Sequence, residues 1–252
     1  PVNVVPGAQT VNEDATLLIS GLSVSDVDAD TNNVLLTLTV LNGTLTLNTG
    51  VTNGVSAGQV ATNGSASVVV TAPITAINNT LADANGLSYQ GTQDFNGIDT
   101  LTVVTNDQGN TGAGGSQSDT DTVSITVTAL NDAPVNTVPG AQTVNEDTAL
   151  FISGISIVDV DAAASSVQLT LAVTNGTLSV NTAVSGGVSA GEVSNNNTAV
   201  VTITAALSAI NNTLSDSIGL SYQGTADFNG SETLTVAIDD QGNTGAGGAM
   251  ND

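Results

Sequence analysis

The stretch VLLTLTVLNGTLTL, residues 34–47, decides the fold class. Apolar residues alternate with threonine in its first half, so an extended strand would carry on one face the side chains of Val34, Leu36, Leu38 and Val40. A shorter alternating run, residues 44–47, follows directly. Between them lies Asn42-Gly43, a pair that readily adopts the positive φ of tight hairpin turns. The stretch therefore predicts two strands separated by a turn.

The same pattern continues through the first half of the chain. Alternating runs recur at residues 101–104 and 120–130, and the Asn-Gly pairs lie at 42–43, 53–54, 63–64, 85–86 and 96–97. Hydrophobic residues make up 40% of the chain but aromatics only 2%, so the core must be built from Val, Leu, Ile and Ala, which suit β-sheets. Short strands at this spacing predict an all-β fold, an antiparallel Greek-key β-sandwich.

One segment has helical rather than strand periodicity. In PITAINNTLADANGL, residues 73–87, the apolar residues Ile74, Ile77 and Leu81 recur at i, i+3 and i+7. Pro73 is expected at the first helical position and Gly86 at the end of the run. The counterpart in the second half keeps the spacing through Leu207, Ile210 and Leu214. We therefore expect one short helix in each half, across the end of its sandwich.

The chain is an internal repeat with a constant offset of 133 residues. PVNTVPGAQTVNEDTAL, residues 134–150, matches residues 1–17 at 14 of 17 positions, and LSYQGTQDFNG at 87–97 returns as LSYQGTADFNG at 220–230. A repeat of this length is a whole domain, because solenoid units are about 20–50 residues long. We expect one domain over residues 1–133 and a second over 134–252.

The second domain is expected to lack its last strand. Asp252 is the counterpart of Asp119, so residues 120–133, which hold the strongest alternating run of the first copy, have no counterpart in the sequence. Such a sandwich would expose unpaired backbone groups beside an apolar core. Three outcomes remain open: the strand follows in a longer parent chain, another molecule donates it, or the second copy is frayed.

The charge balance excludes several classes of partner. The chain has 23 carboxylates and no Lys, Arg or His, for a net charge of −23, and the sequence therefore predicts no intramolecular salt bridge. This charge repels nucleic acid and anionic lipid, and no apolar run approaches the roughly 20 residues of a membrane helix. Cysteine is absent, which excludes disulfides and thiolate chemistry.

The carboxylates are clustered at expected strand ends and loops. The clusters are Glu13–Asp14, Asp26–Asp28–Asp30, Asp94, Asp107, Asp119–Asp121 and Asp132 in the first copy, and Glu146–Asp147, Asp159–Asp161, Asp227 and Asp239–Asp240 in the second. Ca²⁺ takes 6–8 oxygen ligands from carboxylates, amides and carbonyls, which acidic loops supply. The alternative, a solvated acidic surface, explains the net charge but not the clustering.

Four motifs, in this order along the chain, resemble those of cadherin repeats: VNED at 11–14, SDVDAD at 25–30, TNDQG at 105–109 and LNDAPV at 130–135. The whole 133-residue unit is similar to the cadherin-like tandem repeats of giant bacterial surface and biofilm proteins of the adhesin type. The resemblance implies one or two Ca²⁺ ions at the junction between successive repeats. The ligands that it implies are Glu13, Asp94, Asn131, Asp132, Asp159, Asp161 and Asp240. Two departures are that Ala129 replaces the first linker Asp and that Asp94 lies in QDFNG.

The resulting hypothesis is a calcium-rigidified extracellular repeat of a bacterial adhesin, matrix or filament protein, which acts as a spacer or fibre building block. Its expected partners are the neighbouring repeats of the same chain. Further copies in a fibre and a polysaccharide are additional candidates. The alternative is a cadherin-like carbohydrate-binding module, because Tyr89, Phe95, Tyr222 and Phe228 recur at matched positions; packing of these aromatics in the core is the favoured interpretation. Enzymatic activity is not expected, since glycosidase sites recruit other polar and aromatic groups besides two carboxylates, and the chain has no His, Lys, Arg or Trp.

Overall fold

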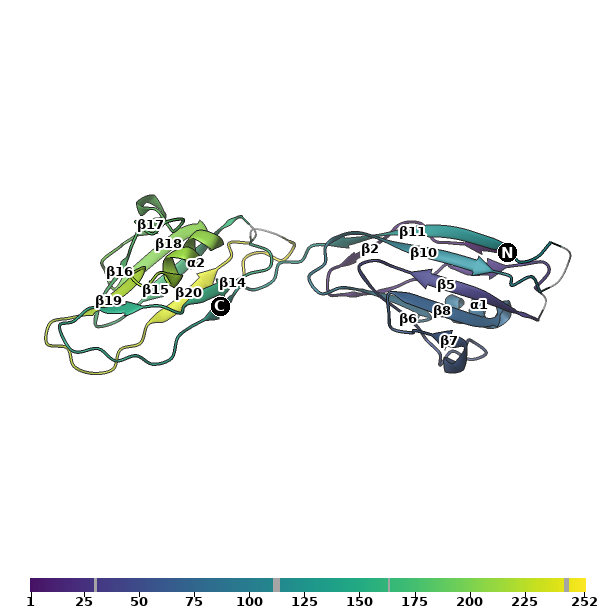
Figure 1. Cartoon of the computed structure of the whole chain (residues 1–252), viewed down its shortest axis with the longest axis horizontal. Coiled ribbons are helices and arrows are strands. Elements are labelled where there is room, and N and C mark those ends of the chain that lie inside the picture. Colours follow the sequence, from purple (N-terminus) through teal and green to yellow (C-terminus); the bar gives the residue numbers. More distant parts are fainter. Residues whose placement is uncertain (30, 111–113, 163, 243–244) are drawn as a thin grey trace. The chain divides into compact units, whose positions relative to one another are not determined.

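The chain forms two compact units, Pro1–Ala129 and Leu130–Asp252. This computed structural model describes residues 1–29, 31–110, 114–162, 164–242 and 245–252. The division falls four residues before the boundary set from the repeat, so that the segment 130–133 belongs to the second unit. Each unit is a β-sandwich with one short α-helix, and the all-β prediction is confirmed (Figure 1).

The described residues of the first unit form eleven strands and one α-helix. They are β1 (Val2–Val4), β2 (Gln9–Asn12), β3 (Thr16–Leu18), β4 (Ser23–Ser25), β5 (Asn33–Thr39), β6 (Gly43–Leu47), β7 (Val60–Ala61), β8 (Ser67–Pro73), α1 (Ile74–Ala82), β9 (Leu87–Gly91), β10 (Gly97–Asn106) and β11 (Ser118–Thr128), with a short 3₁₀ turn at Ala57–Gln59. One sheet has the order β2-β11-β10-β5-β8-β7 and the facing sheet the order β3-β9-β6, while β1 pairs with β4. The β2 strand is parallel to β11, and the other pairs of the large sheet are antiparallel.

The alternation of β5 sets the core of the first unit. Val34, Leu36 and Leu38 are fully buried, and the intervening Leu35 and Thr37 are only half-buried. This is what period-2 geometry predicts for a strand with one face on the core. The facing sheet contributes Leu45 and Tyr89, which are also fully buried.

The helix prediction is confirmed in both units. In α1, Ile77 and Leu81 are 1% exposed, and the counterparts in α2, Ile210 and Leu214, are fully buried. One detail of the prediction is wrong. Pro73 is the N-cap in an extended conformation and the last residue of β8, not the first helical residue.

The turn at Asn42-Gly43 is not a hairpin turn. It takes the chain from β5 in the large sheet to β6 in the facing sheet. Gly43 has no positive φ; it is required because a Cβ atom there would lie 2.4 Å from the carbonyl oxygen of Gln90. Positive φ is found at three of the other Asn-Gly pairs, at Asn53, Gly64 and Gly97.

The second unit repeats these elements with a smaller main sheet. Its elements are β12 (Val135–Thr137), β13 (Leu150–Ile152), β14 (Ser156–Val158), β15 (Ser166–Ala172), β16 (Gly176–Val180), β17 (Val193–Ser194), β18 (Val200–Ala206), α2 (Leu207–Ser215), β19 (Leu220–Gly224) and β20 (Thr235–Asp239), with a 3₁₀ turn at Ala190–Glu192. Its main sheet has the order β17-β18-β15-β20, and the facing sheet the order β13-β19-β16. Among the described residues, β2 and β11 have no strand counterparts.

Candidate metal centre

The acidic loop after β14 is preorganised by its own backbone. Oδ1 of Asp159 accepts hydrogen bonds from the backbone amides of Asp161 at 2.8 Å and Ala162 at 2.9 Å. These bonds hold the carboxylate in place. Its second oxygen, Oδ2, is buried and has no hydrogen-bond partner among the described residues. A buried carboxylate oxygen without a partner is unfavourable unless a proton or a cation meets it.

The segment before β12 is held against the same loop. The backbone amide of Asp132 donates a 2.6 Å hydrogen bond to Oδ2 of Asp161, and carboxylate oxygens of these two residues lie within 4.8 Å of one another. The chain therefore gathers carboxylates from two separate segments of the second unit. With no basic side chain in the sequence, these like charges must be balanced by protons, water or metal cations.

Asn131 is the most enclosed member of the group, with 2% of its surface exposed. Its backbone amide donates to the carbonyl of Ala246 at 3.0 Å. Its side-chain Nδ2 donates to Oδ2 of Asp240 at 2.5 Å and to the carbonyl of Gly248 at 2.9 Å. Its Oδ1 is buried with no hydrogen-bond partner in the described part of the chain. An amide oxygen in this state is a ready ligand for a hard cation.

Asp240 is ionised under ordinary conditions. Burial alone would raise the pKa of its carboxyl group, but hydrogen bonds from the backbone amides of Gly242 and Met250 and from Asn131 together bring the pKa below its usual value. The two amide bonds measure 2.8 and 2.7 Å. Asp240 is thus a negative charge, 2% exposed, that anchors Asn131.

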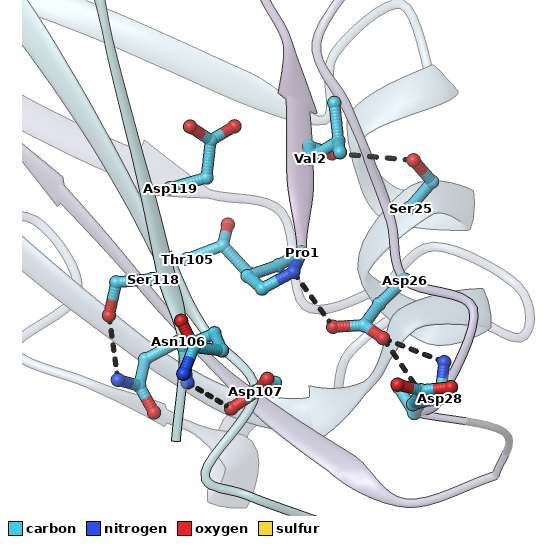
Figure 2. Close-up of polar contacts among 12 residues, drawn as sticks. Pro1, Val2, Ser25, Asp26, Asp28, Thr105, Asn106, Asp107, Ser118 and Asp119 are labelled. Atoms are coloured by element: carbon cyan, nitrogen blue, oxygen red, sulfur yellow. Dashed lines mark hydrogen bonds and ion pairs between the residues drawn. The ribbon is translucent and has the colours of Figure 1, made fainter. Parts of the chain in front are cut away.

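The matching loop of the first unit has a cation beside it (Figure 2). Oδ1 of Asp26 accepts from the amides of Asp28 at 2.8 Å and Ala29 at 3.2 Å, as in the second unit. Its Oδ2 lies 3.0 Å from the amino group of Pro1. This ion pair contradicts the prediction that the chain has no salt bridge, because that prediction counted side chains and left out the terminal ammonium. Asp30, the third acid of this cluster, lies outside the described residues.

The two ligands expected from the first unit have different hydrogen-bond partners. Glu13 is 3% exposed, and its Oε2 accepts a hydrogen bond from Nδ2 of Asn96 at 3.3 Å. Asp94 lies within 4.8 Å of Asp14, counted between carboxylate oxygens, and its amide donates to Oδ1 of Asp14 at 3.3 Å. The structure thus adds Asp14 and Asn96, which the sequence argument left out of the ligand set.

The donor chemistry of the second unit suits calcium. All the candidate ligands there are carboxylate or amide oxygens, the ligands of hard cations, and the sequence has no His or Cys. Within the described part of the chain, buried oxygens of Asn131 and Asp159 lack hydrogen-bond partners, and such oxygens could accept a cation.

Asp99, which belongs to none of the acidic clusters found in the sequence, has a structural role. Asp99 is 1% exposed and accepts hydrogen bonds from the amides of Leu41 at 3.1 Å and Asn42 at 2.9 Å, and from the hydroxyl of Tyr89 at 3.1 Å. Burial, and then the charge and hydrogen bond of Asp99, raise the pKa of the Tyr89 phenol. The signal for this role was the alternation within β10, which places Asp99 on the same face as Leu101 and Val103.

The recurrent tyrosines are core residues. Tyr89 is fully buried and Tyr222 is 8% exposed, so both side chains pack in the cores of their units. Burial, and then the nearby Glu232 carboxylate, raise the pKa of Tyr222. Glu232 stands at the position of Asp99 and accepts hydrogen bonds from the amides of Thr174, Asn175 and Thr233.

Comparison with known proteins gives structural likenesses only. No protein-family model matches the chain, and no curated protein matches it. Among solved structures, human CDH23 EC21-23 matches with 14% identity and a TM-score of 0.34, over 96% of this chain and 68% of that one. The Bacteroides ovatus mixed-linkage glucan utilization locus protein SGBP-B, solved with a mixed-linkage heptasaccharide, matches with 12% identity and a TM-score of 0.21, over 93% of this chain and 50% of that one. Neither helix in the described ranges has the length and apolar character needed to cross a bilayer.

Proposed function

We propose that this chain is a calcium-rigidified structural repeat of an extracellular bacterial adhesin, matrix or filament protein, serving as a spacer or a fibre building block. The supporting observation is that, among the residues that the structure describes, buried oxygens of Asn131 and Asp159 have no hydrogen-bond partner. The same unit gathers the carboxylates of Asp132, Asp161 and Asp240. The sequence resemblance to cadherin-like repeats supports the extracellular setting, and the absence of any basic side chain supports a cation as the missing counter-charge.

The residues of the second unit would convert cation binding into stiffness. Asn131 and Asp132 belong to the segment that joins the two repeats, and they are tied to Asp240 and to Asp161 by hydrogen bonds. Calcium, when bound, supplies a positive charge that offsets the repulsion among these carboxylates. The linker is then held to its own repeat and samples fewer conformations. A string of such repeats resists bending when each linker is fixed in this way.

The test of this function is calcium binding by the whole chain. We expect isothermal calorimetry to give a dissociation constant of about 10⁻⁴–10⁻³ M, the range of extracellular calcium modules. The double substitution Asp132→Ala with Asp161→Ala removes two carboxylates of the group and should abolish this binding. NMR relaxation should show the Asn131 and Asp132 amides to be less mobile in calcium than in EGTA.

The matched control is Asp83→Ala with Asp216→Ala, which removes the same number of charges from the loops after α1 and α2. These two residues hold only local turns, through the amides of Asn85 and Ile218. The control should bind calcium like the parent chain. Equal binding by the parent and by the Asp132/Asp161 variant would refute the proposed site.

A further inference from the structure

The second unit has an open groove in its core. The groove has a volume of about 1180 Å³. One wall is formed by residues 138–147 and the other by residues 230–234 with Val236 of β20, and the side chains of Ile152, Ile155 and Tyr222 also line it. All the lining residues belong to the second unit.

The first unit shows what fills the equivalent place. There β11 pairs with β10 over ten residue pairs. It directs into the core the side chains of Val123, Ile125 and Val127, which are 1%, 0% and 3% exposed. Two residues of β10, Leu101 and Val103, are covered as a result and are 0% and 1% exposed.

Without such a strand, the corresponding side chains of the second unit are less covered. Leu234 and Val236, the counterparts of Leu101 and Val103, are only half-buried. Burying more of these apolar side chains would stabilise the fold. Within the described residues, β20 is the edge strand of its sheet, so its outer backbone groups face the groove.

The end of the chain already sets the register for a strand in the groove. Ile238 and Asp252 exchange backbone hydrogen bonds of 3.0 and 3.1 Å. Thr105 and Asp119 are opposite one another at the matching place in the first unit, where β11 continues along β10. An extended segment that continues from this register would run along β20 toward Gly230.

The opposite wall is also ready to pair. In the first unit β2 lies parallel to β11, and Val11 packs against the core. Its counterpart in the second unit, the segment 142–145, is not a strand, and Val144 is 40% exposed. The two walls of the groove therefore correspond to the two strands that flank β11 in the first unit. Only a polypeptide in extended conformation satisfies the backbone groups of both walls at once.

We propose that this groove is a strand-acceptor site for an extended segment with the sequence pattern of β11, bound antiparallel to β20 and parallel to residues 142–145. Its occupant is the last-strand sequence of this type of repeat, with apolar residues at the positions of Val123, Ile125 and Val127. Binding would convert the segment 142–145 into a strand and would cover Leu234 and Val236.

The test adds a synthetic peptide, TDTVSITVTAL (residues 120–130), to the whole chain. The peptide has no aromatic residue, and Tyr222 lines the groove whereas Tyr89 is already fully buried, so a change in tyrosine fluorescence reports occupancy. We expect saturable binding at 0.15 M salt, where charges beyond about 8 Å are screened. Hydrogen exchange should slow in residues 142–145 and 230–238 and stay unchanged in β10.

Two peptide variants separate strand docking from nonspecific adhesion, and they leave the protein itself unaltered. In the first unit Ile125 points into the core and Ser124 is exposed. A peptide with Ile125→Asp should bind more than tenfold more weakly, because burying a carboxylate costs more than the 1.4 kcal/mol that corresponds to tenfold. A peptide with Ser124→Asp, of the same net charge, should bind like the parent. Equal affinities for the two variants would refute the proposal.

A covalent version tests the register. A chain extended after Asp252 by the sequence of residues 120–133 should fill its own groove and should no longer bind the peptide. Undiminished peptide binding by the extended chain would place the peptide elsewhere and overturn the assignment. A chain that is dimeric before peptide is added, stays dimeric and binds no peptide would assign the groove to a second copy and would also overturn it.

Discussion

At the scale of single residues, the repeat provides an internal control for each polar contact. In the first unit the hydroxyl of Thr105 donates a 2.6 Å hydrogen bond to Oδ1 of Asn3, and both residues are buried. In the second unit Ile238 replaces the threonine, and Oδ1 of Asn136 is left buried with no hydrogen-bond partner among the described residues. One substitution between the copies has thus removed a donor but kept its acceptor.

This difference predicts that threonine is tolerated better at Ile238 than at other buried isoleucines. We expect Ile238→Thr to be less destabilising than Ile203→Thr, a substitution of another buried isoleucine of the same sheet. Ile203→Thr should cost about 2 kcal/mol in lost packing and unpaired hydroxyl. At Ile238 the new hydroxyl can donate to Asn136, which offsets about 1 kcal/mol of that cost. Urea unfolding of both variants measures the difference, and equal losses would contradict the explanation.

At the scale of elements, the turn after each helix requires a glycine because there is no space for a side chain, not because the backbone has positive φ. Gly86 follows α1, and its backbone conformation does not have positive φ. A Cβ atom at Gly86 would lie 1.7 Å from the carbonyl oxygen of Thr80. The same overlap recurs between Gly219 and Thr213 after α2. In the turn after each helix, the carbonyl oxygen of the helix therefore lies too close to the glycine for any side chain to fit.

We predict that Gly86→Ala destabilises the first unit by about 1–3 kcal/mol, because the added methyl group forces the backbone to shift. The matched control is Gly58→Ala, since a Cβ atom at Gly58 has no neighbour within 4 Å and this residue also lacks positive φ. The control should change the free energy of unfolding by less than about 0.5 kcal/mol. Thermal unfolding of the two variants tests this, and a neutral Gly86→Ala would show that the turn relaxes freely.

Local pattern was enough to predict the elements but not their assembly. The period of residues 34–41 and the spacing of Ile74, Ile77 and Leu81 specify a strand and a helix, because side-chain direction follows directly from backbone geometry. That β5 and β6 belong to different sheets depends on contacts with distant strands, which no short window contains. The burial of Asp99 has the same origin, since its hydrogen-bond partners come from β9 and the turn before β6.

The candidate site was predictable to a similar degree. The acidic clusters can be located in the sequence, because an aspartate in a DxD pattern accepts hydrogen bonds from the backbone of its own loop. The Asp159 carboxylate accepts such bonds from the amides of Asp161 and Ala162. The enclosure of Asn131 was not predictable, because it requires the carbonyls of Ala246 and Gly248, more than 100 residues away in the sequence. The terminal ammonium at Asp26 was missed because the argument counted side chains alone.

At the scale of the whole molecule, the charged side chains are all negative. With 23 carboxylates and no Lys, Arg or His, protonation can bring the net charge from −23 to nearly zero but not to a substantial positive value. An ordinary protein regains repulsive charge below its isoelectric point, because its basic side chains remain ionised. This chain has no basic side chain and cannot do so.

We therefore predict that acid makes the chain associate and that stronger acid does not redissolve it. As the pH falls through about 4, the carboxylates take up protons, repulsion between molecules disappears and turbidity rises. At pH 2 the net charge is still close to zero, so the turbidity should persist. Light scattering between pH 7 and pH 2 measures this, in EGTA so that calcium plays no part. A chain that carries a hexalysine tag should clear again at pH 2, since the tag restores a positive charge. A clear, monodisperse solution of the untagged chain at pH 2 would show that carboxylate repulsion is not what keeps the molecules apart.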